Sequence, residues 1–407
     1  MSISPLRILM VSEDIPASTL GGLGKHVVRL GNYLIGQGHH VDILGRSDID
    51  YEACREETGF QGTFIPGFDF RHTNFKEGMS GVFMPFKRPY IARRIARAIL
   101  RIAHQYDVIH YHGHYPMIGR YIPSRINFVQ TRHDQGSDCP IHLRFKQGQV
   151  CTSNNAFDCA ACAPRAKPGW LREQVSAFAV RQYRAQTAES FARHKTLFVS
   201  DFLKQAFLRH VPSADSRNMH VVHNFIDTRS LPGRQAGKPG HVLFVGRIDE
   251  AKGVMALLDE LAGLDSHGIE FDIIGDGPNR AVCEACHAAP NIRFHGWKLQ
   301  DEALAATANA GRIVVPSILE ESCGTTILEG MALGKPVYAL ARGGTPELAR
   351  YELWPGQLRQ FGSIAELART LVEETGQAVP QSADGAFGAD IHLLAVSILN
   401  VYRTPAS

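Results

Sequence analysis

The chain has 407 residues, 44% of them hydrophobic and 20% charged, which suits a globular protein of two or three domains. The net charge of +3 does not indicate a nucleic-acid partner. The N-terminal segment lacks the features of a secretion signal and no apolar run approaches the roughly 20 residues of a membrane span, so we expect a cytoplasmic protein with reduced cysteines.

Strand-like and helix-like segments alternate from the start of the chain. An apolar run at residues 7–12 leads into a loop with Gly21 and Gly22, and then into an amphipathic helix. The glycines permit close approach of a ligand to the backbone beside a helix N-terminus. Further strands and helices alternate after it, and one apolar strand ends at His133. The alternation of strands and helices predicts parallel sheets, which bind ligands beyond the carboxyl ends of their strands.

The segment 87–106 is expected to form a basic amphipathic helix. Isoleucines at 91, 95, 99 and 102 form one stripe, and arginines at 93, 97 and 101 form another. Such a helix can lie against an anionic membrane surface. The alternative is a solvated outer helix whose isoleucines belong to the core.

Four cysteines lie close together in a polar insert at 139–162: Cys139, Cys151, Cys159 and Cys162. Clustered thiols in a cytoplasmic chain indicate a structural zinc site or, as the alternative, an iron–sulfur cluster. The compartment disfavours disulfides.

A second series of strands and helices begins after the Gly- and Pro-containing linker 231–240. Arg247 ends its first strand and Lys252 begins the following helix. Together they place two cations where a diphosphate can bind. The next strand runs into a turn with Gly275 and Gly277.

The stretch 311–348 reads as a strand, a loop with Glu321, a helix that opens at Gly324 and contains Glu329, a second strand and a Gly-Gly turn. A helix N-terminus attracts an anion, and carboxylates beside it can bind hydroxyls. Phosphate and polyol together describe a sugar nucleotide. The alternative is that both glutamates are solvated acids that favour the helix dipole.

These residues resemble the donor signature of glycosyltransferase family 4, the "group 1" glycosyltransferases. Glu-Ser-Cys-Gly at 321–324, Glu-Gly-Met-Ala-Leu-Gly-Lys-Pro-Val at 329–337 and Gly-Gly-Thr-Pro-Glu at 343–347 carry the resemblance. The Gly-Arg and Lys-Gly pair at 246–253 and the His-Asp at 133–134 extend it. Cys323 stands where the family usually has Phe, and a subset of the family has a similar Cys-rich insert after His-Asp.

The resemblance implies an α/β protein with the GT-B fold, in which two Rossmann-like domains with parallel sheets face each other across a cleft. Residues 1–228 would form the acceptor-side domain and residues 229–385 the nucleotide-sugar domain. Residues 386–407 would form a helix that crosses back to the first domain.

The resemblance also implies roles for individual residues. The expected catalytic set is His133, Glu321, Arg247 and Lys252. The expected donor-binding set is Gly21, Gly22, Arg247, Lys252, Gly275, Gly277, Glu321, Thr325 and Glu329. No cofactor is expected for catalysis, because the protein's cations and a helix N-terminus would stabilise the departing diphosphate in place of a divalent metal.

The expected reaction is retaining transfer of a sugar from a nucleotide sugar to a glycan or lipid-linked acceptor in bacterial cell-surface polysaccharide synthesis, peripheral to the inner face of the membrane. A UDP-sugar is favoured as donor and a GDP-sugar comes second. One alternative is a nucleotide-sugar epimerase or hydrolase on the same fold. Another is a zinc-stabilised interaction protein with a vestigial donor site.

Overall fold

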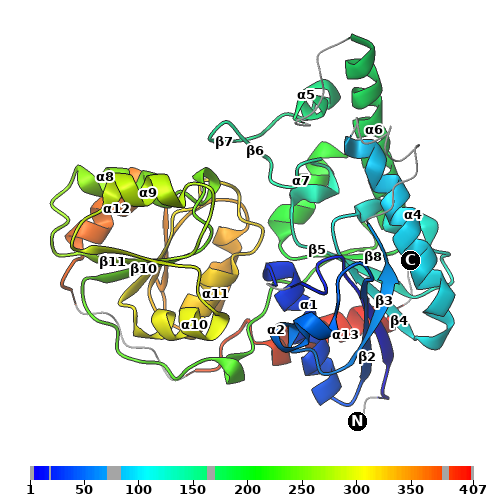
Figure 1. Cartoon of the computed structure of the whole chain (residues 1–407), viewed down its shortest axis with the longest axis horizontal. Helices are drawn as coiled ribbons and strands as arrows, with labels where there is room; N and C mark the ends of the chain where they lie inside the picture. Colours follow the sequence, from blue (N-terminus) through cyan, green and yellow to red (C-terminus); the bar gives the residue numbers. More distant parts are fainter. Residues whose placement is uncertain (1–3, 18–19, 71–83, 163–169, 378–384, 405–407) are drawn as a thin grey trace. The chain divides into compact units, whose positions relative to one another are not determined.

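The computed structural model describes residues 4–17, 20–70, 84–162, 170–377 and 385–404. The chain forms two compact units (Figure 1). The first comprises residues 1–144, 152–223 and 395–407, and the second comprises residues 145–151 and 224–394. The units divide between His223 and Asn224, whereas the sequence placed the boundary after residue 228.

The first unit is built on a parallel sheet with the strand order β3-β2-β1-β4-β5-β8-β9 within the described residues. Its strands are β1 (Arg7–Val11), β2 (His40–Arg46), β3 (Thr63–Phe68), β4 (Val108–His112), β5 (Phe128–Arg132), β8 (Lys195–Phe198) and β9 (Met219–Val221). The central strands are buried along their whole length, as expected for a parallel sheet covered on both faces.

Helices cover this sheet on both faces. The helices of the unit are α1 (Gly22–Gly36), α2 (Arg55–Thr58), α4 (Met84–Ile102), α5 (Ala156–Ala161), α6 (Trp170–Arg193), α7 (Asp201–His210) and α13 (Ile391–Arg403). Of these, α5 lies in the insert and packs against α6 and not against the sheet. Figure 1 shows α1 and α13 on one side of the sheet and α4 on the other. The last helix is fixed by polar contacts, because Asn127 Nδ2 donates to Tyr402 O at 2.7 Å and Lys195 Nζ donates to Val401 O at 2.8 Å.

The second unit has a parallel sheet with the order β12-β11-β10-β13-β14-β15 within the described part of the chain. Its strands are β10 (His241–Val245), β11 (Glu270–Ile274), β12 (Ile292–Gly296), β13 (Arg312–Val315), β14 (Val337–Leu340) and β15 (Leu358–Phe361). Its helices are α8 (Val254–Ala262), α9 (Arg280–His287), α10 (Gln300–Asn309), α11 (Thr325–Ala332) and α12 (Ile364–Glu373). In Figure 1, α8, α9 and α12 lie on one face of the sheet and α10 and α11 on the other. A two-stranded hairpin, β6 (Phe145–Lys146) with β7 (Gln149–Val150), groups with this unit.

The predicted basic helix corresponds to α4. Ile95 and Ile99 are fully buried in the core of the first unit, whereas Arg93, Arg97 and Arg101 are exposed. The side chains of residues 84–88 lie outside the described residues, and Lys87 and Arg88 are among them. The isoleucine stripe therefore serves the core, while Arg93, Arg97 and Arg101 face solvent and the half-buried Arg94 donates a hydrogen bond to Asp69 O.

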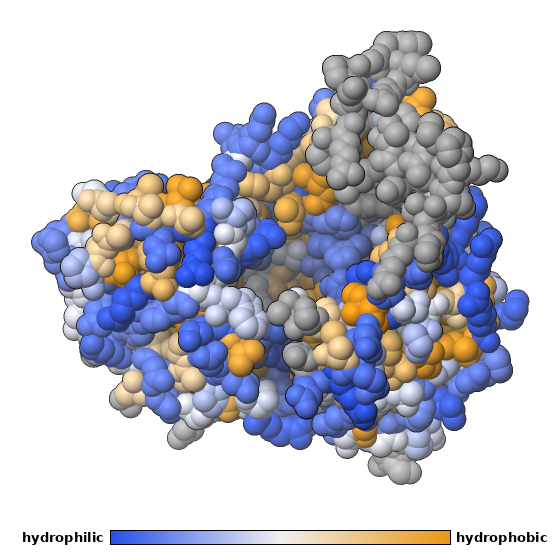
Figure 2. All heavy atoms as spheres, viewed as in Figure 1, coloured by the Kyte–Doolittle hydropathy of each residue, from blue (hydrophilic) through white to orange (hydrophobic). Residues whose placement is uncertain are grey.

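The described surface is mixed in character. Figure 2 shows hydrophobic side chains in separate patches among hydrophilic ones on the face in view. Within the described residues, no helix combines the length and the apolar character that crossing a bilayer requires.

Candidate functional site

Arg247 and Lys252 lie in the turn that joins strand β10 to helix α8. The turn contains a short 3₁₀ helix, Glu250–Lys252, which Asp249 caps by accepting a hydrogen bond from Lys252 N at 2.9 Å. Asp249 also forms an ion pair with Arg247, whose side chain is 56% exposed. The turn therefore presents a solvent-facing guanidinium at the carboxyl end of a central strand.

Lys252 turns instead towards Glu321 in the loop after β13. Lys252 Nζ donates to Glu321 Oε1 at 2.6 Å, and Ser317 Oγ donates to the same oxygen at 2.6 Å. Burial alone would raise the pKa of Glu321, but the charge of Lys252 and the two hydrogen bonds outweigh it and lower the pKa below its usual value. Glu321 is therefore an ionised carboxylate, held by two donors within its own unit.

Helix α11 begins at Thr325, directly after Gly324, which confirms the predicted start. Gly324 offers no side chain to cap the helix, so no side-chain hydrogen bond caps its first turn. The first N–H groups of a helix have no partner within it and carry a partial positive charge. One turn further on, Glu329 Oε1 accepts a hydrogen bond from Gln300 Nε2 of α10 at 2.9 Å.

Gly275 and Gly277 have a structural reason to be glycine. Gly275 has φ +149°, and a Cβ there would lie 1.8 Å from Gly246 O. A Cβ on Gly277 would lie 2.3 Å from Ile248 O. Both glycines thus allow the end of β11 to pack against the turn that carries Arg247. Their role in donor binding stays a prediction.

The predicted Gly-Gly turn holds the backbone of Glu321. Gly343 has φ +60°, and a Cβ there would lie 2.3 Å from Glu321 O. Gly344 N donates to the same carbonyl at 2.7 Å. The two glycines therefore fix where this carboxylate emerges from the loop.

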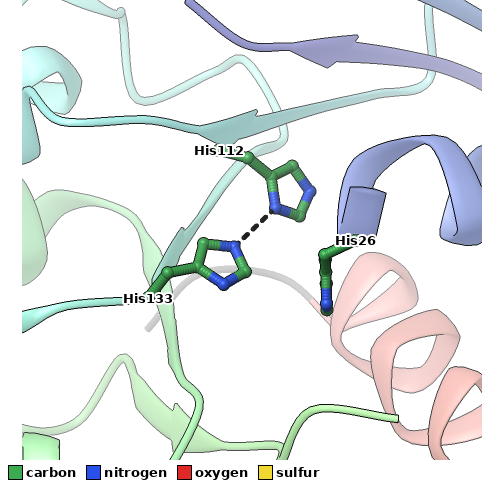
Figure 3. A group of neighbouring side chains, drawn as sticks. All are labelled: His26, His112 and His133. Atoms are coloured by element: carbon green, nitrogen blue, oxygen red, sulfur yellow. Dashed lines mark hydrogen bonds between the residues drawn. The ribbon is translucent and has the colours of Figure 1, made fainter. Parts of the chain in front are cut away.

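In the first unit, His133 follows strand β5 and lies in a group of three histidines (Figure 3). Its Nε2 lies 3.1 Å from Nδ1 of His112, the last residue of β4, and the two nitrogens share a hydrogen bond. The ring of His26, from α1, meets the His133 ring edge-on at a centroid distance of 4.7 Å. Burial lowers the pKa of all three imidazoles, and it lowers that of His26 to about 3. They are neutral at pH 7.

Asp134 organises a second, charged group at the same edge of the sheet. Its Oδ2 lies 3.3 Å from Nδ1 of both His114 and His142, while its Oδ1 accepts a hydrogen bond from Gly136 N at 2.7 Å. Burial disfavours a charged His114, but its hydrogen bonds to Asp134 and Asp14 dominate and raise its pKa to about 10. A protonated imidazole thus lies next to the neutral group.

Gly21 and Gly22 differ from the glycines of the second unit. Gly21 is the N-cap of α1 without a side-chain hydrogen bond, and both glycines are exposed. A Cβ at either position would meet no described atom within 4 Å. Packing therefore does not require glycine here, which leaves the predicted approach of a ligand as a reason for it.

The predicted metal cysteines lie in the insert after Asp134. Cys139 and Cys159 are buried, and Cys159 Sγ accepts a hydrogen bond from Arg184 Nη2 at 3.1 Å. Cys162 Sγ lies 3.6 Å from Asp158 O, and Cys151 follows the hairpin β6–β7. Among the described residues, the groups of three or more ligand-type side chains within 4.8 Å of one another contain no cysteine. The described thiols are thus not arranged as a zinc site requires, and zinc at this insert stays a prediction.

The sequence did not single out several residues that shape these groups. Ser317 and Gln300 contact the two predicted glutamates, and His112 contacts His133. For His112 a signal existed, because it ends a buried strand next to the one that ends before His133. For Ser317 and Gln300 the chain offers no pattern that would have indicated a partner.

Two parallel α/β units with polar side chains at the carboxyl ends of their strands define a protein of the GT-B fold. A solved structure of Anabaena Alr3699/HepE in complex with UDP and glucose superposes with a TM-score of 0.65 and covers 97% of this chain and 98% of that one. Its sequence identity of 15% makes this a likeness of fold. The predicted fold class is confirmed.

The chain belongs to glycosyltransferase family 4. Residues 20–230 match the family described as "Glycosyltransferase Family 4", and residues 239–373 match "Glycosyl transferases group 1". An uncharacterized glycosyltransferase of Methanocaldococcus jannaschii is 30% identical over 371 residues, 86% of this chain and 84% of that protein. The 2-deoxystreptamine glucosyltransferase of Streptomyces kanamyceticus is 33% identical over 147 residues, 35% of this chain and only 38% of that relative.

Proposed function

We propose that this protein is a retaining glycosyltransferase that moves a sugar from a nucleotide sugar, with UDP favoured over GDP, to a glycan or lipid-linked acceptor. Family membership supports the reaction class. The complex of Anabaena HepE with UDP and glucose supports the favoured nucleotide.

One observation carries the proposal: Lys252 and Glu321 meet at the carboxyl ends of strands β10 and β13, shortly before the uncapped first turn of α11. Lys252 contacts Glu321 at 2.6 Å, and Glu321 lies four residues before the start of α11 at Thr325. Cations and helix N–H groups suit a diphosphate, and carboxylates suit the hydroxyls of sugar and ribose. In this assignment Glu321 binds the transferred sugar, Glu329 binds the ribose and Thr325 lies beside the phosphates.

Charge development explains how these groups would accelerate transfer. Breaking the bond between the anomeric carbon and the diphosphate leaves an oxocarbenium-like sugar and places negative charge on the departing phosphate. Arg247, Lys252 and the first turn of α11 supply fixed positive charge and dipoles, which stabilise such charge without reorganisation. The mechanism needs no divalent metal. The Asp-Ile-Asp sequence at 48–50 is a pattern that can bind a divalent metal, but it lies in the first unit, where Asp48 already accepts two hydrogen bonds from Arg46, at 2.9 and 2.6 Å.

In the first unit, His133 would contact the sugar near the reacting carbon, and Gly21 and Gly22 would approach the phosphates. A neutral imidazole at this position can donate or accept a hydrogen bond without placing a second positive charge beside the oxocarbenium-like sugar. Retention, with attack from the face of the leaving group, is the proposed stereochemistry.

The arginine face of α4 would bring the enzyme to an anionic membrane surface that carries the acceptor. Arg93, Arg97 and Arg101 are exposed and unaccompanied by an acid along the helix. Each such side chain near an anionic surface contributes roughly 1 kcal/mol of attraction.

A thermal-shift screen tests the donor assignment. UDP and UDP-sugars should raise the melting temperature, because a ligand at about 100 times its Kd stabilises the native state by about 2.7 kcal/mol. Labelled sugar should then move from the stabilising donor to an acceptor in a bacterial membrane extract. Donor turnover to an epimer or free sugar without transfer would support the epimerase or hydrolase alternative, and absence of any nucleotide shift would contradict the proposal.

Arg247→Ala should abolish most transfer with the fold intact. Removing a group that stabilises developing charge typically costs about 3 kcal/mol, or roughly a hundredfold in rate. The control is Arg293→Ala, which removes an exposed arginine that pairs with Asp272 at 2.7 Å. An Arg247→Ala enzyme that keeps activity within about threefold of the parent would refute the assignment.

A further inference from the structure

We propose that His26, His112 and His133 form a binding site for a divalent transition-metal ion of the kind that Zn²⁺ and Co²⁺ represent. One ring nitrogen from each residue lies within 4.8 Å of the others. The three side chains come from helix α1, the end of β4 and the residue after β5, so three separate elements of one unit bring them together (Figure 3).

The spacing of the first two nitrogens already suits coordination. Nδ1 of His112 and Nε2 of His133 are 3.1 Å apart. Two imidazole nitrogens bound to one tetrahedral zinc ion at about 2.0–2.1 Å are about 3.3 Å apart. A small separation of the two rings and a rotation of His26 would complete a three-imidazole set, with a fourth position open.

The second ring nitrogen of His112 also suits a metal. A histidine binds metal as the neutral imidazole, with its proton on the ring nitrogen that does not bind. When His112 binds through Nδ1, its proton must sit on Nε2. That nitrogen is buried and has no hydrogen-bond partner among the described residues, so carrying the proton there sacrifices no other contact.

The donor set selects the class of ion. Three nitrogens without a carboxylate favour zinc, cobalt, nickel or copper over magnesium or calcium, which prefer oxygen ligands. The neighbouring group of His114, Asp134 and His142 is a weaker candidate, because Nδ1 of both histidines already faces the Asp134 carboxylate and Nε2 of His114 faces Asp14.

An ion bound to the three histidines would inhibit sugar transfer. This consequence alone rests on the proposed function. A nitrogen of His133 that coordinates an ion cannot contact the donor sugar. The site would therefore make the enzyme sensitive to inhibition by zinc, although catalysis itself uses no metal.

Titration of EDTA-washed protein with Co²⁺ tests the site directly, without any sugar substrate. The parent should bind an ion with the weak visible bands of nitrogen ligation. Removing a ligand by His112→Ala or His26→Gln should weaken this binding at least about tenfold, since even the loss of a supporting residue costs about 10–100-fold. His104→Ala, at an exposed position on the same unit, is the control and should bind as the parent does.

The outcomes are distinct. Binding that survives both His112→Ala and His26→Gln overturns the proposal, and loss only in His142→Asn would move the site to the Asp134 group. Intense thiolate charge-transfer bands would assign the ion to the cysteines instead. His26→Gln, at a half-buried position on α1, keeps the test valid if the buried His112→Ala variant does not fold.

In transfer assays, the ratio of rates without and with Zn²⁺ should fall towards one in His26→Gln. If that ratio stays unchanged while metal binding is lost, the predicted inhibition by zinc is contradicted, whereas the metal site itself is supported.

Discussion

At the scale of single residues, the contact between Lys252 and Glu321 links two groups expected to bind different parts of one donor. Lys252 was expected to bind phosphate and Glu321 the sugar, yet they share a hydrogen bond of 2.6 Å. An ion pair of this kind holds both side chains near the strand ends before a ligand arrives. Phosphate binding would then compete with the carboxylate for the ammonium group.

Lys252→Met should destabilise the protein by about 1–3 kcal/mol at pH 7, because it leaves a largely buried carboxylate without its cation. The pKa of Glu321 is lowered in the folded protein, so the folded chain binds this proton less tightly than the unfolded chain. The stabilisation is therefore fully present above the ordinary pKa of 4.5 and is lost progressively as the pH falls from there through the lower pKa of Glu321 in the folded protein.

Urea unfolding of both proteins at neutral pH and at about pH 4 measures this effect. The difference between parent and Lys252→Met should be largest at neutral pH and should shrink in acid. Lys298→Met breaks an exposed pair with Glu302 and serves as the control. An equal difference at both pH values would mean that the ionised form of Glu321 is not the source of the effect, and no difference at neutral pH would mean that the pair does not stabilise the fold.

The sequence indicated residues for this candidate site but not the contacts among them. Glu321, Glu329 and the helix start could be read from adjacent letters. Lys252 and Glu321 are 69 positions apart, and His112 and His133 are 21 apart. Their meeting depends on strand order, which a periodic pattern does not specify.

At the scale of elements, the glycines predicted to bind the donor fall into two groups, those packed against other backbone and those that border open space. A Cβ at Gly275 would collide with the backbone of the β10 turn, whereas one at Gly21 would meet no described atom within 4 Å. Gly275 is therefore part of the architecture that places Arg247, and Gly21 borders open space at the start of α1.

Gly275→Ala and Gly21→Ala should separate these two roles. The first should lower stability by about 1–3 kcal/mol, since φ is positive and a carbonyl must move. The second should leave the melting temperature near that of the parent and weaken donor binding. Melting curves with and without UDP measure both effects. A Gly275→Ala protein as stable as the parent would contradict the close approach, and a Gly21→Ala protein with undiminished UDP shift would remove Gly21 from the donor site.

The cysteine insert carries four thiols whose metal content can be measured directly. If Cys139, Cys151, Cys159 and Cys162 close one zinc site, purified protein should carry about one zinc ion per chain in the insert. Cys159→Ser should lower that content, while donor binding by the second unit should survive. The exposed Cys286→Ser is the matched control. Iron with a brown colour would indicate the iron–sulfur alternative. Metal-free protein with four reactive thiols would remove the site.

At the scale of the whole molecule, the division into two units does not follow the order of the chain. Helix α13 follows the second unit in sequence, yet from Ala395 onwards it groups with the first. Lys195, a buried lysine, donates to Val401 O and to Asn127 Oδ1 at 2.8 and 2.6 Å. The family resemblance implied such a return. The sequence pattern itself did not indicate it, because the lysine that contacts this helix lies in a strand 206 positions away.

Transfer should persist in EDTA, because the proposed mechanism assigns stabilisation of the diphosphate charge to Arg247, Lys252 and the first turn of α11 and not to a divalent ion. Zinc removed from the three-histidine group should not lower the rate, since an ion there would block His133. An assay over a few minutes, before any structural zinc leaves the insert, measures this with Cys159→Ser in parallel. A prompt loss of rate that magnesium or manganese restores would place a metal in the chemistry and would overturn the proposed role of the protein's own cations. A slow loss in the parent, matched by a low initial rate in Cys159→Ser, would instead locate the metal requirement in the insert.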